Sequence, residues 1–318
     1  MIDWPNHLEA WRNWRDAMQG DRMHHAWLLA GKSGLGKHEF AEAAAREMLG
    51  RAPGMDHHPD IHSITYGPKD EKEDKKRAEG KDYERARSIR IGQIREMQHR
   101  LTTRPTLGDK RVVIINPADD MERNASNALL KSLEEPPAGT YFLLVTHRPA
   151  RLLPTIRSRC RVLRFPTLAD EQIALLLDQQ APMTMPDLRE AALAAAGGSL
   201  GNALTFIEQE LGEISSLMHR ILDQGDPHFE LRGQLSRAIG PRPDRARLTA
   251  IMDLALSILG EQIHLTSGIR QQAIVDAHEE FVRLSGQAPT FNFDAGLLSI
   301  EIGTLLARVA EASEPANA

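Results

Sequence analysis

Near its N-terminus the chain reads Trp27-Leu28-Leu29-Ala30-Gly31-Lys32-Ser33-Gly34-Leu35-Gly36-Lys37-His38. The first four residues suit a buried strand, the glycines and the lysine suit a turn, and a helical pattern over residues 39–49 follows directly. A strand that leads through a glycine-rich loop with a lysine into a helix is the context of a Walker A phosphate-binding loop. This order of elements predicts an α/β fold.

Short apolar runs alternate with helical patterns from here to residue 166. The runs that we expect to form strands are residues 27–30, 61–66, 112–115, 142–146 and 162–165. The helical stretch at residues 123–135 ends at Pro136 and Pro137, because proline lacks the amide proton that a helix needs. Helical connections of this length join parallel strands, so the sequence predicts a parallel sheet of five strands.

The strand pattern stops after residue 166, and only helical patterns follow. Helices are expected over residues 170–180, 188–196, 245–265, 267–284 and 295–312. Gly197 and Gly198 close the second of these helices, as glycines commonly do at a helix C-terminus. The predicted fold class is therefore α/β plus all-α, with three domains over residues 1–166, 167–211 and 212–318.

A strongly charged insert over residues 67–88 interrupts the α/β domain. Within it, residues 69–88 contain eight basic and seven acidic side chains and no aliphatic residue larger than alanine. Such a segment cannot supply a hydrophobic core. We interpret it as a solvated loop or a mobile charged helix, and the alternative is a docking segment for a partner.

The composition argues against several classes of protein. Hydrophobic residues make up 41% of the 318 and aromatic residues 5%, which favours a largely helical protein over an all-β sandwich. The formal net charge of −5 argues against a protein that coats DNA by itself. Cys160 is the only cysteine, and no apolar run reaches the roughly 18 residues that a membrane span needs. We expect a cytoplasmic protein with no membrane contact.

The glycine-rich loop contains groups that bind phosphate. Gly31, Gly34 and Gly36 allow successive backbone amides to turn toward an anion, and Lys37 would bridge the outer phosphates. The hydroxyl residue that should ligate Mg²⁺ is replaced by His38. Two interpretations stay open: weakened nucleotide binding, and an empty loop whose glycines are kept for packing.

The acidic residues of a working ATPase are also missing. The strand at residues 112–115 should end in one acid that holds Mg²⁺ and one that orients the attacking water, but Asn116 and Pro117 stand there. Asp119 and Asp120 lie just beyond and could serve only in a shifted register. Without Mg²⁺ and an activated water, phosphoryl transfer is disabled. We predict a chain that does not hydrolyse ATP; the alternative is an active P-loop ATPase that uses Lys37 and a shifted acid.

Four further motifs accompany the loop. They are Met23-His24-His25-Ala26, His58-Pro59-Asp60-Ile61, residues 127–137 with their closing prolines, and Ser158-Arg159-Cys160. With these motifs, most of residues 1–210 resembles the AAA+ clamp-loader family of DNA polymerase III. The resemblance implies an AAA+ domain with a five-stranded parallel sheet over residues 1–166, a small helical lid over residues 167–211, and a helical collar over residues 212–318 through which subunits assemble.

The resemblance implies that Arg159 is an arginine finger, with Ser158 and Cys160 as its motif neighbours. Such a residue reaches ATP-Mg on the neighbouring subunit, where its guanidinium neutralises the charge that develops on the transferred phosphoryl group. Motor subunits of the family also carry a sensor arginine, and Gly201 takes its place here. The residues alone leave a second interpretation open, in which Arg159 pairs with a surface carboxylate.

The function that the resemblance implies is that of a non-hydrolysing stator, which helps to load the sliding clamp onto primed DNA in replication. Its partners would be the gamma/tau motor subunits and the delta subunit, with the clamp and DNA reached through the complex. The chain would have no cofactor of its own and no intrinsic catalysis. It would nevertheless be a component of a DNA-directed DNA polymerase holoenzyme, which is a nucleotidyltransferase. A DNA-binding module that uses the charged insert or the arginine-rich region around Arg159 is a further alternative.

Many relatives in that family carry a zinc module of four cysteines ahead of the His-Pro-Asp motif, and this chain has no cysteine there. His57, His58 and His62 remain, but structural zinc normally requires thiolates or a well-spaced Cys/His set. The sequence predicts no metal site.

Overall fold

The structure is a computed structural model, and it describes residues 3–20, 23–50, 57–263, 265–287 and 295–312. The chain folds into two compact units, Met1–Leu168 and Ala169–Ala318. The first unit contains every described strand, and its end lies close to the domain boundary expected at residue 166. A further division of the second unit at residue 211 stays a prediction.

The first unit is built on a parallel sheet. Its strands are β1 (Ala26–Ala30), β2 (Ile61–Ile64), β3 (Arg111–Ile115), β4 (Thr140–Thr146) and β5 (Arg161–Arg164). They form a five-stranded sheet in the order β2-β3-β4-β1-β5, and every pairing is parallel. The α/β class, the five predicted strands and their parallel arrangement are confirmed. Strand β2 ends at Ile64, two residues earlier than predicted, and the backbone C=O of Thr65 accepts from the Gln93 side chain.

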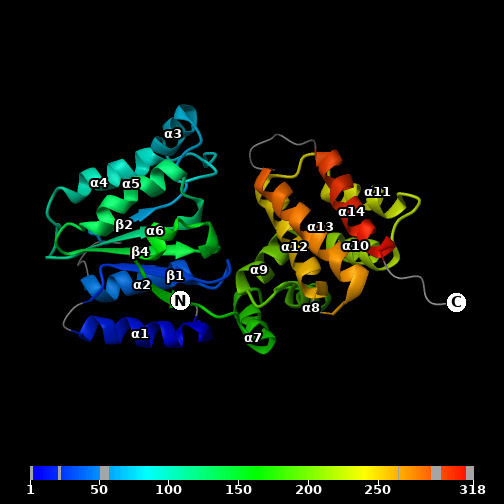
Figure 1. The fold of residues 1–318 in the computed structure, drawn as a ribbon, viewed down its shortest axis with the longest axis horizontal. Helices are drawn as coiled ribbons and strands as arrows, with labels where there is room; N and C mark the ends of the chain where they lie inside the picture. The colour runs from blue at the N-terminus through cyan, green and yellow to red at the C-terminus, as the bar shows by residue number, and fades with distance from the viewer. Residues whose placement is uncertain (1–2, 21–22, 51–56, 264, 288–294, 313–318) are drawn as a thin grey trace. The chain divides into compact units, whose positions relative to one another are not determined.

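Helices cover both faces of the sheet (Figure 1). They are α1 (Leu8–Gln19), α2 (Lys37–Leu49), α3 (Glu71–Ala78), α4 (Ile91–Leu101), α5 (Arg123–Glu134) and α6 (Pro154–Arg157), with 3₁₀ turns η1 (Pro5–His7), η2 (Ala118–Asp120) and η3 (Pro149–Arg151). The two helices expected at residues 39–49 and 123–135 are α2 and α5. In Figure 1, α1 and α2 lie on one side of the sheet, and α4 and α5 lie on the other.

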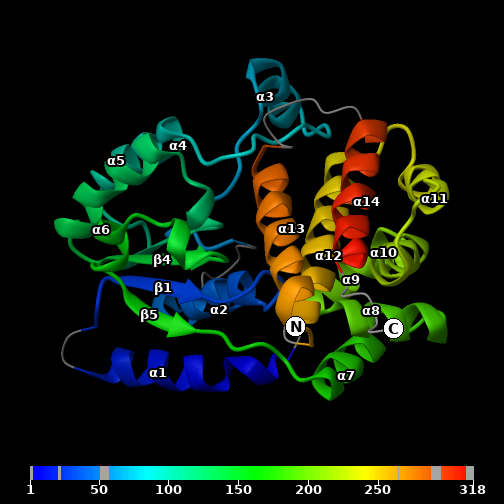
Figure 2. The same cartoon turned by 45° about the vertical axis from the view of Figure 1, so that its right-hand side comes forward.

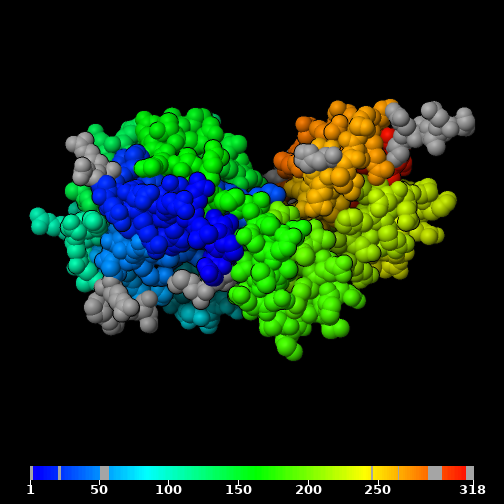
Figure 3. Space-filling model, turned by 90° about the horizontal axis from the view of Figure 1, so that it is seen from below, coloured from blue at the N-terminus to red at the C-terminus, as the bar shows by residue number. Residues whose placement is uncertain are grey.

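The core of this unit has two apolar layers. Successive side chains of a strand point to opposite faces. Trp27 and Leu29 of β1 therefore join the cluster formed with α1 and α2, whereas Leu28 joins the cluster formed with α4 and α5. Trp14 of α1 and Phe40 of α2 are fully buried in the first cluster. Figure 3 shows the outer surface of α1, in dark blue, on the outside of this unit.

The charged insert contains a helix, α3, and a charged helix is one of the forms expected for it; its expected mobility stays a prediction. Asp70 caps the helix by accepting the backbone N–H of Glu73 at 3.0 Å. The Glu73 side chain turns inward and accepts from Lys76 Nζ and from the backbone N–H of Glu84, each at 2.7 Å. The buried acid thus ties the helix to the segment that returns to the domain.

The second unit is all-α. Its helices are α7 (Asp170–Gln180), α8 (Pro186–Ala195), α9 (Leu200–Glu208), α10 (Gly212–Gln224), α11 (Glu230–Ile239), α12 (Arg245–Ile263), α13 (Gly268–Gln287) and α14 (Ala295–Glu311). The five helices predicted after residue 166 are confirmed, with small shifts at their ends. Helix α13 contacts both α12 and α14, and the three lie side by side in Figure 2. In the described part of the chain, no helix is long and apolar enough to cross a membrane.

A buried ion pair joins three parts of this bundle. Arg232 Nε lies 3.0 Å from Asp226 Oδ2, and the two side chains are 7% and 3% exposed. The guanidinium also donates to Thr304 Oγ1 of α14 at 3.2 Å. Gly303 makes room for this arginine, because a Cβ there would lie 2.4 Å from Arg232 Cγ. The pair fixes the loop before α11 against α14.

Candidate functional site: the phosphate loop and the arginine finger

The three glycines of the loop are fixed by backbone conformation and by packing. Gly34 and Gly36 have φ values of 70° and 71°, in the left-handed region that favours glycine. A Cβ at Gly31 would lie 2.5 Å from the carbonyl oxygen of Phe165, and one at Gly36 would lie 2.3 Å from Trp4 Cε2. These contacts alone require glycine at both positions, so they support the interpretation in which the glycines serve packing.

An N-terminal segment lies against the loop. The Trp4 ring, which packs on Gly36, stacks on the His7 ring with 5.3 Å between their centroids. His7 Nε2 lies 2.8 Å from the carbonyl oxygen of Leu35 inside the loop. Burial lowers the pKa of His7, which favours the neutral ring that this packing requires. Sequence reasoning missed Trp4 and His7, because nothing in the local pattern links them to a loop thirty residues later.

Lys37 is turned into its own loop. Its side chain is 2% exposed, and Nζ donates to the carbonyl oxygen of Gly31 at 2.8 Å and to that of Lys32. Burial lowers the pKa of Lys37 to about 8, although the charges of Asp119 and Glu39 oppose this shift. The lysine therefore satisfies loop carbonyls in this structure.

This burial predicts a pH dependence of stability. Between about 8 and 10.5, Lys37 of the folded chain has lost its proton, while the unfolded chain, at the ordinary lysine pKa, retains it. The free energy of unfolding then rises with pH, because the unfolded state binds more protons. Relative to a Lys37→Met variant, wild type should gain up to about 3 kcal/mol across this range. Urea denaturation of wild type and Lys37→Met at about pH 8 and at about pH 10.5 measures this gain in the free energy of unfolding. If the two proteins differ in stability by the same amount at both pH values, Lys37 is not a buried amine that titrates in this range.

Neither candidate acid is available at the end of β3. Asp119 Oδ1 accepts the backbone N–H of His147 at 2.9 Å, and Oδ2 accepts that of Arg148 at 3.1 Å. Burial raises the pKa of Asp119, but the backbone N–H of His147, together with further hydrogen bonds, outweighs it and holds the pKa below the ordinary value. Asp120 accepts from the Tyr66 hydroxyl at 2.5 Å and lies 3.6 Å from Arg151 Nη1. Both carboxylates hold the local structure together.

His147 is a site residue that sequence reasoning missed. It directly follows β4, and its buried Nδ1 has no hydrogen-bond partner among the described residues. Burial, with a contribution from the charge of Lys37, lowers the pKa of His147 to about 4. The structure thus brings together the phosphate loop, Asp119 and His147 at the carboxyl ends of β1, β3 and β4. Ligand sites gather at this edge of parallel sheets, which is the signal that could have found His147.

Ser158, Arg159 and Cys160 lie at the end of α6. Arg159 Nη1 donates to the carbonyl oxygen of Thr155 at 2.9 Å, and Nη2 pairs with Glu134 Oε1 of α5 at 2.6 Å. Ser158 Oγ donates to the same Thr155 carbonyl at 3.1 Å. Cys160 packs against the apolar core, and burial raises the pKa of its thiol to about 12. The predicted pairing of Arg159 with a surface carboxylate exists, and the arginine side chain is still 35% exposed.

The metal prediction concerns the histidines near β2. His58 Nδ1 accepts the backbone N–H of Asp60 at 3.1 Å, and burial lowers the pKa of His62. Among the residues that the structure describes, no three His, Cys, Asp or Glu side chains lie close enough to hold a metal ion. Gly201, at the position of the sensor arginine, lies in α9.

Comparisons with known proteins place these features in a family. A family model described as DNA polymerase III, delta subunit, matches residues 6–169. The delta-prime subunit of Haemophilus influenzae is 32% identical over 292 residues, which cover 87% of this chain and 80% of that protein. The tau/gamma subunit of the same organism is 30% identical over 207 residues, covering 62% of this chain and 28% of that protein.

The delta-prime subunit of Pseudomonas aeruginosa is 34% identical over 190 residues, which cover 55% of this chain. The match spans about half of that relative, 53% of its length. Because one family model matches half of the sequence and one relative aligns over most of it, the chain belongs to the family of DNA polymerase III delta-prime subunits.

Proposed function

We propose that this chain is a non-hydrolysing stator of a clamp-loader complex and that it supplies Arg159 to ATP-Mg on a neighbouring subunit. The proposal that the chain does not hydrolyse ATP rests on the residues at the end of β3. There Asn116 and Pro117 offer no carboxylate, and both oxygens of Asp119 accept backbone N–H groups. With no hydroxyl at His38 either, the residues do not fit Mg²⁺, and the two largest aids to phosphoryl transfer are lacking.

The contacts of Arg159 support the second half. The Thr155 carbonyl holds one end of the guanidinium, while the other end pairs with Glu134, whose side chain is half exposed. Ion pairs at a surface contribute little free energy, so Glu134 can be exchanged for a stronger partner. A phosphate group offers two oxygens to the guanidinium fork and is such a partner.

The partners follow from the same proposal. Chains similar to this one include tau/gamma subunits, so we propose that gamma/tau subunits bind the ATP that Arg159 reaches. The delta subunit would stand beside it in the cytoplasmic complex, and the clamp and primed DNA would be bound through the assembly. The helices of the second unit would join the subunits, with the lid and collar as proposed parts.

The isolated chain provides a test. Purified alone, it is expected to release no phosphate from Mg-ATP above background, because neither Mg²⁺ nor water has a ligand in this loop. A titration with a fluorescent ATP analogue tests the loop itself, and closure by Trp4 and Lys37 predicts no saturable binding. Lys37→Ala serves as the matched control in both measurements. Turnover that Lys37→Ala abolishes would establish the alternative of an active ATPase and overturn the proposal.

A further inference from the structure

Strand β2 has an open side. It lies at the edge of the sheet, next to β3. The backbone N–H of Val112 donates to the carbonyl oxygen of Asp60, and that of Asn116 donates to the carbonyl oxygen of Ile64, each at 2.9 Å. In a parallel ladder a residue directs both backbone groups to the same neighbour, and alternate residues do so. Asp60, His62 and Ile64 therefore face β3.

The residues between them turn their backbone groups outward. Ser63 presents both its N–H and its C=O to the open edge, and no described residue hydrogen-bonds to either group. Farther along, the C=O of Thr65 accepts from Gln93 Nε2 at 2.7 Å, which closes the edge at that end. The side chains of Ser63 and Thr65 are exposed. One strand-like backbone can pair here without displacing a backbone hydrogen bond of Ser63, whose hydroxyl donates to Glu42 Oε1 at 3.1 Å.

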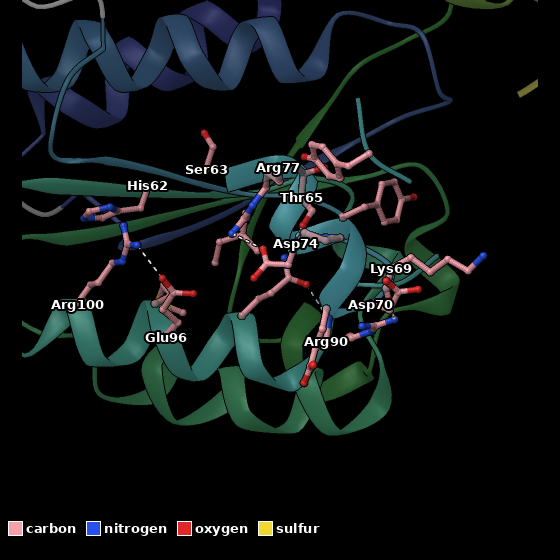
Figure 4. Close-up of a pocket in the computed structure, with 18 of the residues that line it drawn as sticks. His62, Ser63, Thr65, Lys69, Asp70, Asp74, Arg77, Arg90, Glu96 and Arg100 are labelled. Carbon is pink, nitrogen blue, oxygen red and sulfur yellow. Dashed lines mark hydrogen bonds and ion pairs between the residues drawn. The ribbon is translucent and has the colours of Figure 1, made fainter. Parts of the chain in front are cut away.

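A pocket of about 930 Å³ lies along this edge, between β2, α3 and α4. Figure 4 shows Asp74 and Arg77 of α3 between His62 and Arg100 on one side and Lys69 on the other. The volume is in the range of sites that hold ligands. The pocket is an open groove with a hydrogen-bonding strand as one wall and charged side chains of both signs as the others.

Two of the side chains at one end of the groove are His62 and Arg100. Arg111 does not line the groove; it is 3% exposed and donates to the carbonyl oxygen of Arg100 at 3.0 Å. Burial is the largest effect that lowers the pKa of His62. The charges of Arg100 and Arg111 lower this pKa further, and the charge of Asp60 raises it by less. Arg100 itself pairs with Glu96, and both of these side chains are well exposed. An acidic group that enters this end meets the exposed guanidinium of Arg100, in competition with Glu96.

We propose that this groove binds an extended peptide segment of a partner protein, which adds a strand beside Ser63 and places an acidic side chain near His62 and Arg100. An extended backbone supplies the alternating acceptor and donor that the open edge of Ser63 requires. Nucleic acid suits the groove poorly, because phosphates recur along its whole backbone and would meet Asp70 and Asp74, whereas a peptide can place one acidic side chain at Arg100 alone. This inference goes beyond the proposed function and does not depend on Arg159.

The probe is a library of short random peptides displayed on phage and selected against the full chain. Selected peptides are synthesised with a fluorescent label, and their Kd is measured by anisotropy. We expect acidic residues to be enriched. Ser63→Pro removes an N–H that faces away from β3, as proline at an edge strand can. It should weaken binding by about tenfold. Arg100→Gln should weaken it similarly, whereas Arg95→Gln, on the same helix but outside the groove, should change nothing.

Several outcomes would overturn the proposal. They are failure to select any binder, a Kd that neither Ser63→Pro nor Arg100→Gln changes, and displacement of the peptide by primed duplex DNA. Thermal unfolding shows whether each variant is folded. Should Ser63→Pro not fold, N-methylation of the peptide backbone replaces it on unaltered protein, and unchanged affinity then contradicts strand pairing.

Discussion

Arg159→Ala is expected to lower ATP hydrolysis at the neighbouring site of the reconstituted clamp-loader complex by about 10³-fold or more, because arginine fingers contribute rate factors of that size to the site they reach. The substitution removes the charge that would neutralise the transferred phosphoryl group on the neighbouring subunit. Assembly should be unchanged, because the hydrogen bonds and ion pair of the Arg159 side chain among the described residues go only to Thr155, Ser158 and Glu134. Phosphate release and size-exclusion chromatography measure the two effects separately.

Two further variants separate the finger from a structural ion pair. Glu134→Gln leaves the guanidinium in place and removes only its surface partner, so the ATPase rate should stay within about twofold of wild type. Arg157→Ala, at an exposed position two residues earlier, should also leave the rate unchanged. If Arg159→Ala matches these two variants in rate, Arg159 acts only through its pair with Glu134 and the finger is excluded.

Arg232→Leu is expected to lower the free energy of unfolding by about 3–5 kcal/mol, the usual effect of removing one partner of a buried ion pair. Asp226 would keep the backbone N–H groups of Leu231 and of residue 232 but lose the guanidinium. The side chain also contacts Thr304, so the link to α14 is lost with it. Urea denaturation measures the change.

The matched control is Arg237→Leu on the same helix, where an exposed guanidinium donates to the carbonyl oxygen of Gly233 and to no other described residue. Its effect should stay within about 0.5 kcal/mol. Adding Asp226→Leu to Arg232→Leu removes the orphaned charge, so the double variant should recover part of the loss. Equal losses in the single and double variants would show that packing around Gly303, and not the charge pair, stabilises this region.

The sheet could be predicted because its signals are local. Each strand is a short apolar run. In a run such as residues 112–115 the side chains on both faces of the strand are apolar, and all four residues are fully buried. The glycines and Lys37 were also readable, since a turn between a strand and a helix constrains both conformation and chemistry. The helices of the second unit followed from apolar spacing in the same way.

The surroundings of the loop could not be predicted, because they depend on contacts between distant parts of the chain. The Trp4 ring meets Gly36, and the carboxylate of Asp119 meets the backbone of residues 147 and 148. No spacing rule connects such positions. The buried Glu73 was missed for another reason: its insert is so charged that every acidic side chain in it looked solvated.

Burial of Cys160 has a practical consequence for labelling. With a thiol pKa of about 12, the only cysteine of the sequence is a poor nucleophile near neutral pH, where on the order of one thiol in 10⁵ is ionised. A cysteine introduced on the surface therefore outcompetes it for maleimide dyes. Fluorescent reporters can be attached to either unit without replacing the native residue beside Arg159.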